Sequence, residues 1–155
     1  MESKPAGFTL RKSSPPAETE ELYGVWRRAV LATHSFIKPE DIEFYAHILR
    51  ELYLPTVSVL IAADDATDAP IGFLGGDGGQ IDSLFIDPAW HRRGVGRRLM
   101  QEAFKRSRVM RVAVNEPNTP ALAFYLSLGF EIVSRTETDA GGKPYPLLHL
   151  LRMDR

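Results

Sequence analysis

The stretch that decides the fold is Leu84 to Arg98, which reads LFIDPAWHRRGVGRR. An apolar run ends at Asp87-Pro88, and apolar residues recur at helical spacing from Val95 onward. The segment therefore predicts a buried strand over 80–86, a tight connection, and a helix with a strongly basic exposed face. Gly94 and Gly96 in the connection let the backbone approach a ligand closely, because glycine carries no Cβ.

This connection has the features of an anion site. The first backbone N–H groups of a helix lack internal acceptors, and the helix dipole places partial positive charge beside them, which suits phosphate. Four arginines add charge-assisted donors: Arg92, Arg93, Arg97 and Arg98. The spacing is neither GxGxxG, since Leu99 stands at the third glycine, nor a P-loop. The competing interpretation is an ordinary helix start with solvated arginines.

Outward from this stretch, the chain alternates helical and strand patterns without an internal repeat. Helices are expected over about 17–33, from Pro39 onward, after Gly94 and after Asn118. The second of these should bury a stripe made of Ile42, Tyr45, Ile48, Leu49 and Leu52. Strands are expected over 8–12, 56–63, 71–74, 80–86, 109–114, 130–138 and 147–153. This mixed order predicts an α/β (α+β) fold with a mixed central sheet and helices on both faces.

Length and composition indicate a single globular domain over residues 1–155. The chain is 44% hydrophobic and 25% charged, and 19 basic against 20 acidic residues leave a net charge of −1. The absence of cysteine excludes disulfides, thiolate metal ligands and a cysteinyl intermediate. No apolar run reaches the ~18 residues of a membrane span. Because the segment MESKPAGFTLRKSSPPAE also lacks an apolar signal core, we expect a cytoplasmic protein with no membrane partner.

A second motif follows at Asn118-Thr119-Pro120, which is typical of a helix cap. Tyr125 lies in the apolar stripe of this helix, and Gly129 is expected to end it. Taken with His91-Arg92-Arg93-Gly94-Val95-Gly96, the segment resembles the GCN5-related N-acetyltransferase (GNAT) superfamily along nearly the whole chain. Family members carry Gln/Arg-x-x-Gly-x-Gly/Ala after the fourth strand, where His91 replaces the first residue here, and then Asn-x-x-Ala-x-x-x-Tyr before Leu-Gly-Phe. The segments around His34 and Tyr145 further resemble a subgroup of small bacterial members.

The resemblance implies acetyl-CoA as the acetyl donor and a mostly antiparallel sheet that splays between its fourth and fifth strands. The backbone of Leu84, Phe85 and Ile86 would pair with the pantetheine arm as an added strand, and Asn118 would meet the pantetheine or the neighbouring backbone. The implied reaction is direct attack of a primary amine in a ternary complex, with Tyr125 protonating the CoA thiolate. The pyrophosphate would be held by Arg92, Arg93, Gly94, Val95, Gly96 and Arg97.

Such a reaction needs a group that accepts the amine proton, because a lysine-like amine of pKa about 10.4 is neutral only about once in 2,500 at pH 7. Asp82 shares a strand face with Leu84 and is one candidate, against the alternative of a hydrogen-bonded edge carboxylate. His34 is the other, against the alternative of a helix-terminal histidine. Some relatives use a side chain on the fifth strand, but that position is Ala113 here. His149 on the last strand is a weaker candidate.

Two other function classes stay open at this point. Basic residues concentrate between Arg92 and Arg111, as in a nucleic-acid-binding module, but the net charge of −1 favours a small phosphorylated ligand over nucleic acid. A CoA-binding sensor or partner domain without catalysis is the second alternative. The four histidines show no metal-ligand spacing, so we expect no metal. The acceptor is a small-molecule or protein amine, expected to approach residues 30–50 and 139–149, and the sequence leaves open whether a homodimer forms.

Overall fold

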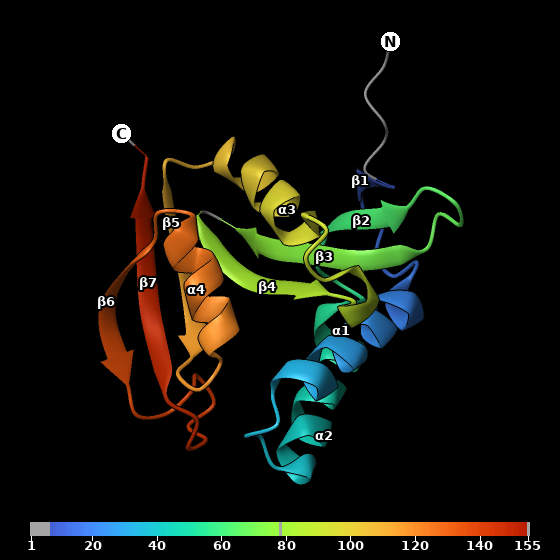
Figure 1. The fold of residues 1–155 in the computed structure, drawn as a ribbon. Coiled ribbons are helices and arrows are strands. Elements are labelled where there is room, and N and C mark those ends of the chain that lie inside the picture. The colour runs from blue at the N-terminus through green and yellow to red at the C-terminus, as the bar shows by residue number, and fades with distance from the viewer. Residues whose placement is uncertain (1–6, 78, 155) are drawn as a thin grey trace. The chain divides into compact units, whose positions relative to one another are not determined.

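The computed structural model describes residues 7–77 and 79–154. Part of the N-terminal segment from which we expect a cytoplasmic protein, residues 1–6, lies outside them. The order of helices and strands follows the prediction (Figure 1). The elements are β1 (Phe8–Lys12), α1 (Thr19–Thr33), α2 (Pro39–His47), a π-helical segment (Ile48–Tyr53), β2 (Leu60–Asp64), β3 (Pro70–Asp77), β4 (Gln80–Ile86), a 3-10 turn (Pro88–Trp90), α3 (Val95–Phe104), β5 (Val109–Asn115), α4 (Thr119–Ser127), β6 (Glu131–Thr136) and β7 (Leu147–Met153).

The seven strands form a mixed sheet in the order β1-β2-β3-β4-β5-β7-β6. The pairs β1/β2, β2/β3, β5/β7 and β6/β7 are antiparallel. The pair β4/β5 is parallel, with Gln80 in register with Arg111 and Ile81 with Val112. The expected mixed, mostly antiparallel sheet is confirmed.

The described residues fall into two compact units, and the first combines residues from 1–75 with Ser83–Glu102. One face of its strands packs against α3, because Leu60 and Ala62 of β2 and Ile71 of β3 share a buried cluster with Val95 and Leu99. On the opposite face of β4, the centre of the Phe85 ring lies 6.4 Å from the centre of the Trp26 ring of α1. Helices therefore cover both faces of these strands, as predicted.

The second unit combines Gly76–Asp82 with Ala103–Arg155. Val112 and Val114 of β5 and Leu148 and Leu150 of β7 are buried and alternate with exposed or half-buried residues. Arg152 ties β7 to the end of α4, since its Nε donates to the Leu128 carbonyl at 2.9 Å. Its guanidinium also lies 3.8 Å from the centre of the Phe104 ring. Gly129 ends α4 with φ 95°, a conformation that favours glycine.

The buried stripe expected for the second helix is wrong at two positions, since Ile42 is buried and Tyr45 and Leu49 are half-buried, but Ile48 and Leu52 are exposed. Ile48 is 38% exposed and Leu52 is 62% exposed, whereas Leu54 is buried. The cause is the π-helical segment, in which the Leu54 N–H bonds the Leu49 carbonyl five residues earlier at 2.8 Å. One extra residue per turn rotates the following side chains, so an α-helical spacing assigns Leu52 to the wrong side.

One strand and one helix also begin later than predicted, each for a local reason. The strand expected from residue 56 begins at Leu60, because Thr56 Oγ1 donates to the Leu52 carbonyl at 2.7 Å and the Val57 N–H to that of Tyr53 at 2.9 Å. The first helix begins at Thr19 rather than near Ala17, because Glu18 has φ 67°.

The π-helical segment makes a testable prediction about stability. Replacement Leu54→Ala should lower the free energy of unfolding by about 2–5 kcal/mol, because it leaves a cavity around a side chain that is 2% exposed. Replacement Leu52→Ala, two residues away, should change it by no more than about 0.5 kcal/mol. Urea unfolding followed by circular dichroism measures both values. A larger loss of stability for Leu52→Ala than for Leu54→Ala would contradict the placement of Leu54 in the core and of Leu52 at the surface.

Candidate active site

The connection between β4 and α3 is braced by Asp87. Its side chain accepts the Ala89 N–H at 3.0 Å and so starts the 3-10 turn. The same carboxylate accepts from Arg28 Nε of α1 at 2.8 Å, and the Asp87 N–H donates to the Ile71 carbonyl of β3 at 2.8 Å. The position from which α3 begins is therefore held by two strands and one helix. Arg28 is a functional residue that sequence reasoning misses, since nothing in α1 marks it as the partner of Asp87.

The loop that follows presents backbone and cations to solvent. Gly94 has φ 83°, and a Cβ built on it would meet nothing within 4 Å. The Val95 side chain is buried, so this residue offers a ligand only its backbone N–H. Arg92, Arg93 and Arg97 are exposed, and the Arg93 guanidinium stacks 3.8 Å from the centre of the Trp90 ring. Open space beside Gly94, the start of α3 and three exposed guanidinium groups fit a pyrophosphate.

The strand segment proposed for the pantetheine arm has both faces occupied. Leu84 and Ile86 pack on the cluster around Val95, and the Phe85 ring lies 5.7 Å from that of Phe73. Ser83 is buried on the same strand and shares a 2.9 Å hydrogen bond between its hydroxyl and that of Tyr53. Because the side chains are held by the core, the backbone of this segment is what remains for recognition. A serine inside an apolar strand is the signal that identifies Ser83, whereas no pattern identifies Tyr53.

Asn118 acts in the structure as the N-cap of α4. Its Oδ1 accepts the Ala121 N–H at 3.3 Å, and its own N–H donates to the Asn115 carbonyl at 2.9 Å. This arrangement fixes the direction in which α4 leaves β5. The capping role predicted from the sequence is thus present, and a contact with pantetheine stays a prediction.

Tyr125 is buried within α4, with 6% of its surface exposed. Its ring contacts those of Phe124 at 5.1 Å and Phe130 at 5.3 Å. Burial raises the pKa of the Tyr125 phenol, so the hydroxyl stays protonated throughout the physiological range. None of the residues in 7–77 and 79–154 forms a hydrogen bond with this hydroxyl, so its proton is free to be donated.

His34 follows α1 and is held by the helix end. Its N–H donates to the Val30 carbonyl at 2.8 Å, and its Nδ1 lies 2.7 Å from Thr33 Oγ1. The Thr33 hydroxyl gives its one proton to the Ala29 carbonyl at 2.8 Å, so Nδ1–H must be the donor to Thr33. Burial lowers the pKa of the His34 imidazole. A neutral ring with an unprotonated Nε2 results, which is a form able to accept a proton.

Asp82 is exposed on β4. By alternation along the strand it shares the face of Leu84 and is opposite to Ser83. Partial burial, and secondly the nearby charge of Asp77, raise the pKa of the Asp82 carboxyl. Asp82, Asn118 and Tyr125 belong to the second compact unit, and His34, Leu84–Ile86 and residues 92–97 to the first.

In the described part of the chain, no three acidic or histidine side chains gather as metal ligands would. None of the helices described is both long and apolar enough to cross a membrane.

Comparison with known proteins identifies the class to which this fold belongs. A family model described as "Acetyltransferase (GNAT) domain" matches residues 55–132. The chain is 40% identical over 137 residues to the peptidyl-lysine N-acetyltransferase YjaB of Salmonella typhimurium, covering 86% of this chain and 91% of that protein. The solution structure of apo-form YjaB from Escherichia coli superposes with a TM-score of 0.86 at 37% identity, covering 96% of this chain and 99% of that one. PaiA N-acetyltransferase from Thermoplasma acidophilum, solved with coenzyme A, shares the fold with a TM-score of 0.73 at 20% identity, over 94% and 99% of the two chains.

The chain therefore belongs to the GNAT family of acetyltransferases. It is an N-acetyltransferase that uses acetyl-CoA as its co-substrate. The family expected from the two sequence motifs is confirmed.

The geometry around His34 predicts both its protonation and its tautomer. We expect this residue to titrate below the ordinary histidine pKa of about 6.5. Because the folded state favours the neutral ring, the unfolded chain binds the proton more readily. The contribution of His34 to the free energy of unfolding should therefore fall as the pH drops from about 6.5 toward the folded-state pKa.

Long-range ¹H–¹⁵N NMR of the imidazole measures both properties, and His34→Asn assigns the signal. The neutral ring should carry its proton on Nδ1. A neutral ring protonated on Nε2 would contradict the hydrogen bonds to Thr33. Protonation above pH 6.5 would contradict the lowering of the His34 pKa by burial.

Proposed function

We propose that this enzyme acetylates the side-chain amine of lysine residues in proteins, and that residues 1–155 act as one acetyltransferase domain. The choice of acceptor is supported by the two YjaB proteins of Salmonella typhimurium and Escherichia coli, each 40% identical and named as peptidyl-lysine N-acetyltransferases. The net charge of −1 sets no barrier to a cationic acceptor.

The proposed reaction is direct transfer in a ternary complex. The neutral amine attacks the thioester carbonyl carbon, so that an N–C bond forms and the C–S bond of acetyl-CoA breaks. The amine loses one proton to a base, and the departing CoA thiolate gains one from an acid. No acetyl group is carried by the enzyme, since the chain holds no cysteine and the mechanism needs no covalent intermediate.

Tyr125 is proposed as the acid, and its environment is the observation that carries the proposed chemistry. The phenol is buried with its pKa raised, and its hydroxyl has no hydrogen-bond partner within the described residues. A phenol in this state stays protonated at neutral pH, so it keeps a proton that it can donate. The CoA thiolate develops its charge beside this apolar site, where desolvation raises the pKa of the thiol as well, and a proton from Tyr125 would neutralise the thiolate as it departs.

His34 is proposed as the group that accepts the amine proton, through Nε2. The contacts with Thr33 hold the ring in the tautomer that leaves this nitrogen unprotonated, and the lowered pKa keeps it so near neutral pH. Asp82 is the alternative base, because its raised pKa makes it more basic than an ordinary exposed carboxylate. In either case the base must help to overcome the cost of forming the neutral amine, which is about 4.6 kcal/mol for a lysine at pH 7.

The donor would be held by the start of α3. Its backbone N–H groups, with Arg92, Arg93 and Arg97, are proposed to bind the pyrophosphate, and the backbone of Leu84–Ile86 the pantetheine arm. Family membership favours this use of the basic segment over nucleic-acid binding, and favours an enzyme over a sensor without catalysis.

Replacement Tyr125→Phe tests the acid. Turnover should fall by about 10²-fold or more, because the thiolate would leave without a proton donor, while the affinity for acetyl-CoA stays unchanged. Steady-state release of CoA thiol and calorimetric titration with CoA measure the two quantities. The control Tyr23→Phe also removes one phenol, from α1, and should leave turnover unchanged. Equal turnover in wild type and Tyr125→Phe would remove Tyr125 from the mechanism.

The acceptor is tested with peptides of blocked N-terminus that contain a single lysine. Incubation of the full chain with acetyl-CoA should add one acetyl group on lysine Nζ, as located by tandem mass spectrometry. A matched peptide with arginine in place of lysine should remain unmodified. Acetylation confined to peptides with a free N-terminus would instead assign the α-amine as acceptor and overturn the lysine proposal.

A further inference from the structure

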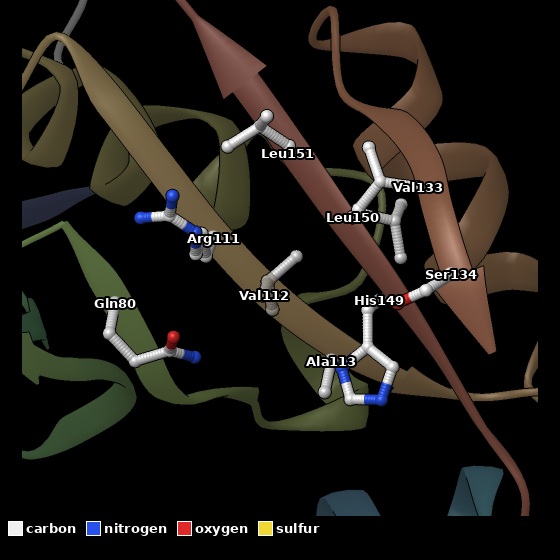
Figure 2. A pocket seen from close by; sticks show the side chains of 9 residues that line it. All are labelled: Gln80, Arg111, Val112, Ala113, Val133, Ser134, His149, Leu150 and Leu151. Carbon is white, nitrogen blue, oxygen red and sulfur yellow. The ribbon is translucent and has the colours of Figure 1, made fainter. Parts of the chain in front are cut away.

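The second compact unit contains a pocket whose lining includes none of the side chains given a role in the proposed reaction. Its volume is about 360 Å³, within the usual range of small-ligand sites of about 300–1,000 Å³. Four strands contribute to it, and Figure 2 shows the side chains around it. The lining residues are Gln80, Arg111, Val112, Ala113, Val133, Ser134, His149, Leu150 and Leu151.

The pocket exists because Ala113 is small. Ala113 pairs with His149 across β5 and β7, and Arg111 pairs with Leu151, so these four side chains share one face of the sheet. Figure 2 shows the imidazole of His149 beside the methyl group of Ala113. Three large side chains thus surround a position that carries only a methyl group, and the space above Ala113 stays open.

A hydroxyl relay fixes how His149 faces this space. Thr136 Oγ1 donates its one proton to the Thr138 carbonyl at 3.0 Å, and lies 3.0 Å from His149 Nε2. Nε2 must therefore be the donor to Thr136, and the neutral ring leaves Nδ1 unprotonated. The two ring nitrogens point away from each other, so Nδ1 faces away from β6 and can accept a hydrogen bond from a ligand.

Arg111 supplies a cation at the same pocket. Its side chain is exposed, and no residue in the described ranges forms an ion pair or hydrogen bond with its guanidinium. Its backbone N–H is used separately, donating to the Gly79 carbonyl at 2.6 Å. Arg111 is diagonal to His149 in the β5–β7 register, a separation of about 7–8 Å that a long arginine side chain spans easily. A guanidinium without a partner suits a carboxylate.

The rest of the lining is apolar. Leu151 is half-buried, and Val133 on the edge strand β6 is 58% exposed. A short aliphatic group placed over these side chains would remove apolar surface from water, at about 25 cal/mol per Å². The pocket therefore combines an unpartnered cation, a hydrogen-bond acceptor and an apolar wall within one small volume.

We propose that this pocket binds a carboxylate whose α-carbon also carries an N–H donor and an aliphatic side chain. The carboxylate pairs with Arg111, the N–H donates to His149 Nδ1, and the aliphatic group contacts Leu151 and Val133. Both a free aliphatic amino acid and the C-terminal residue of a peptide have this chemistry. Binding to this pocket needs no acetyl-CoA.

The experiment is a titration of the ¹⁵N-labelled full chain, followed by NMR, with four probes. Leucine and Gly-Gly-Leu carry all three groups, leucinamide lacks the carboxylate, and 4-methylpentanoate lacks the N–H donor. Leucine should produce saturable shifts in the amide signals of Ala113, His149 and Leu151, and both incomplete probes should bind at least about fivefold more weakly. Equal binding of Gly-Gly-Leu would extend the site to peptide C-termini, and its failure to bind would restrict the site to free amino acids.

Variants decide whether the pocket is the site. Ala113→Leu, and the smaller Ala113→Val, should abolish leucine binding by filling the pocket, while Arg111→Gln should weaken it at least about fivefold. Arg106→Gln removes another exposed arginine, outside the pocket, and should leave it unchanged. No saturable shift at these residues in the folded chain, or unchanged binding in Ala113→Val and Arg111→Gln, would overturn the proposal. Because acetylation is not the readout, failure of this site is distinguishable from failure of the proposed lysine reaction.

Discussion

The start of α3 depends on one constraint, which is that the first N–H groups of a helix have no acceptor inside the helix. In this chain Gly94, which has φ 83° and open space beside its Cα, stands directly before Val95, the first residue of α3. The surrounding contacts serve to hold that opening in place. Asp87 joins the connection to α1 and β3, and the buried side chains of Val95 and Leu99 anchor the helix to the sheet. The acetyl-CoA site proposed at the start of α3 therefore rests on a rigid frame around backbone N–H groups that have no acceptor inside the helix.

A second principle recurs at two histidines. A threonine hydroxyl has a single proton, and in each case that proton goes to a backbone carbonyl. Thr33 bonds the Ala29 carbonyl and thereby makes Nδ1 of His34 a donor. Thr136 bonds the Thr138 carbonyl and thereby makes Nε2 of His149 a donor. The two imidazoles are held in opposite tautomers, so the unprotonated nitrogen is Nε2 in His34 and Nδ1 in His149.

Much of this architecture is predictable from the sequence, because local signals agree with the fold. The bounds of β4 follow from an apolar run closed by Asp87-Pro88, and the cap of α4 follows from Asn118. The two motifs that carry the family also fall on the expected elements. The exposed position of Leu52 is not predictable from an α-helical period, because the π-helical hydrogen bond to Leu49 depends on the packing of the whole segment.

The candidate site is predictable only as far as its backbone motifs and Tyr125. The partners that set its chemistry come from distant parts of the chain, as Arg28 does for Asp87 and Tyr53 for Ser83. The periodicity of a sequence does not predict such pairs, because each pair forms only when distant parts of the chain fold against each other. The pocket above Ala113 is similar in this respect. It results from the register of four strands, and the small side chain of Ala113 leaves a space only because larger side chains lie beside it on the neighbouring strands.

The stacking of Arg93 on Trp90 has a consequence for the cost of binding. An arginine side chain that is free in solution loses on the order of 1–2 kcal/mol of conformational entropy when a ligand immobilises it. Here the guanidinium already lies 3.8 Å from the indole ring, so part of that ordering is completed when the protein folds. An anion that binds at this loop meets a guanidinium that is already in position. Less of the binding free energy is therefore lost in ordering the Arg93 side chain.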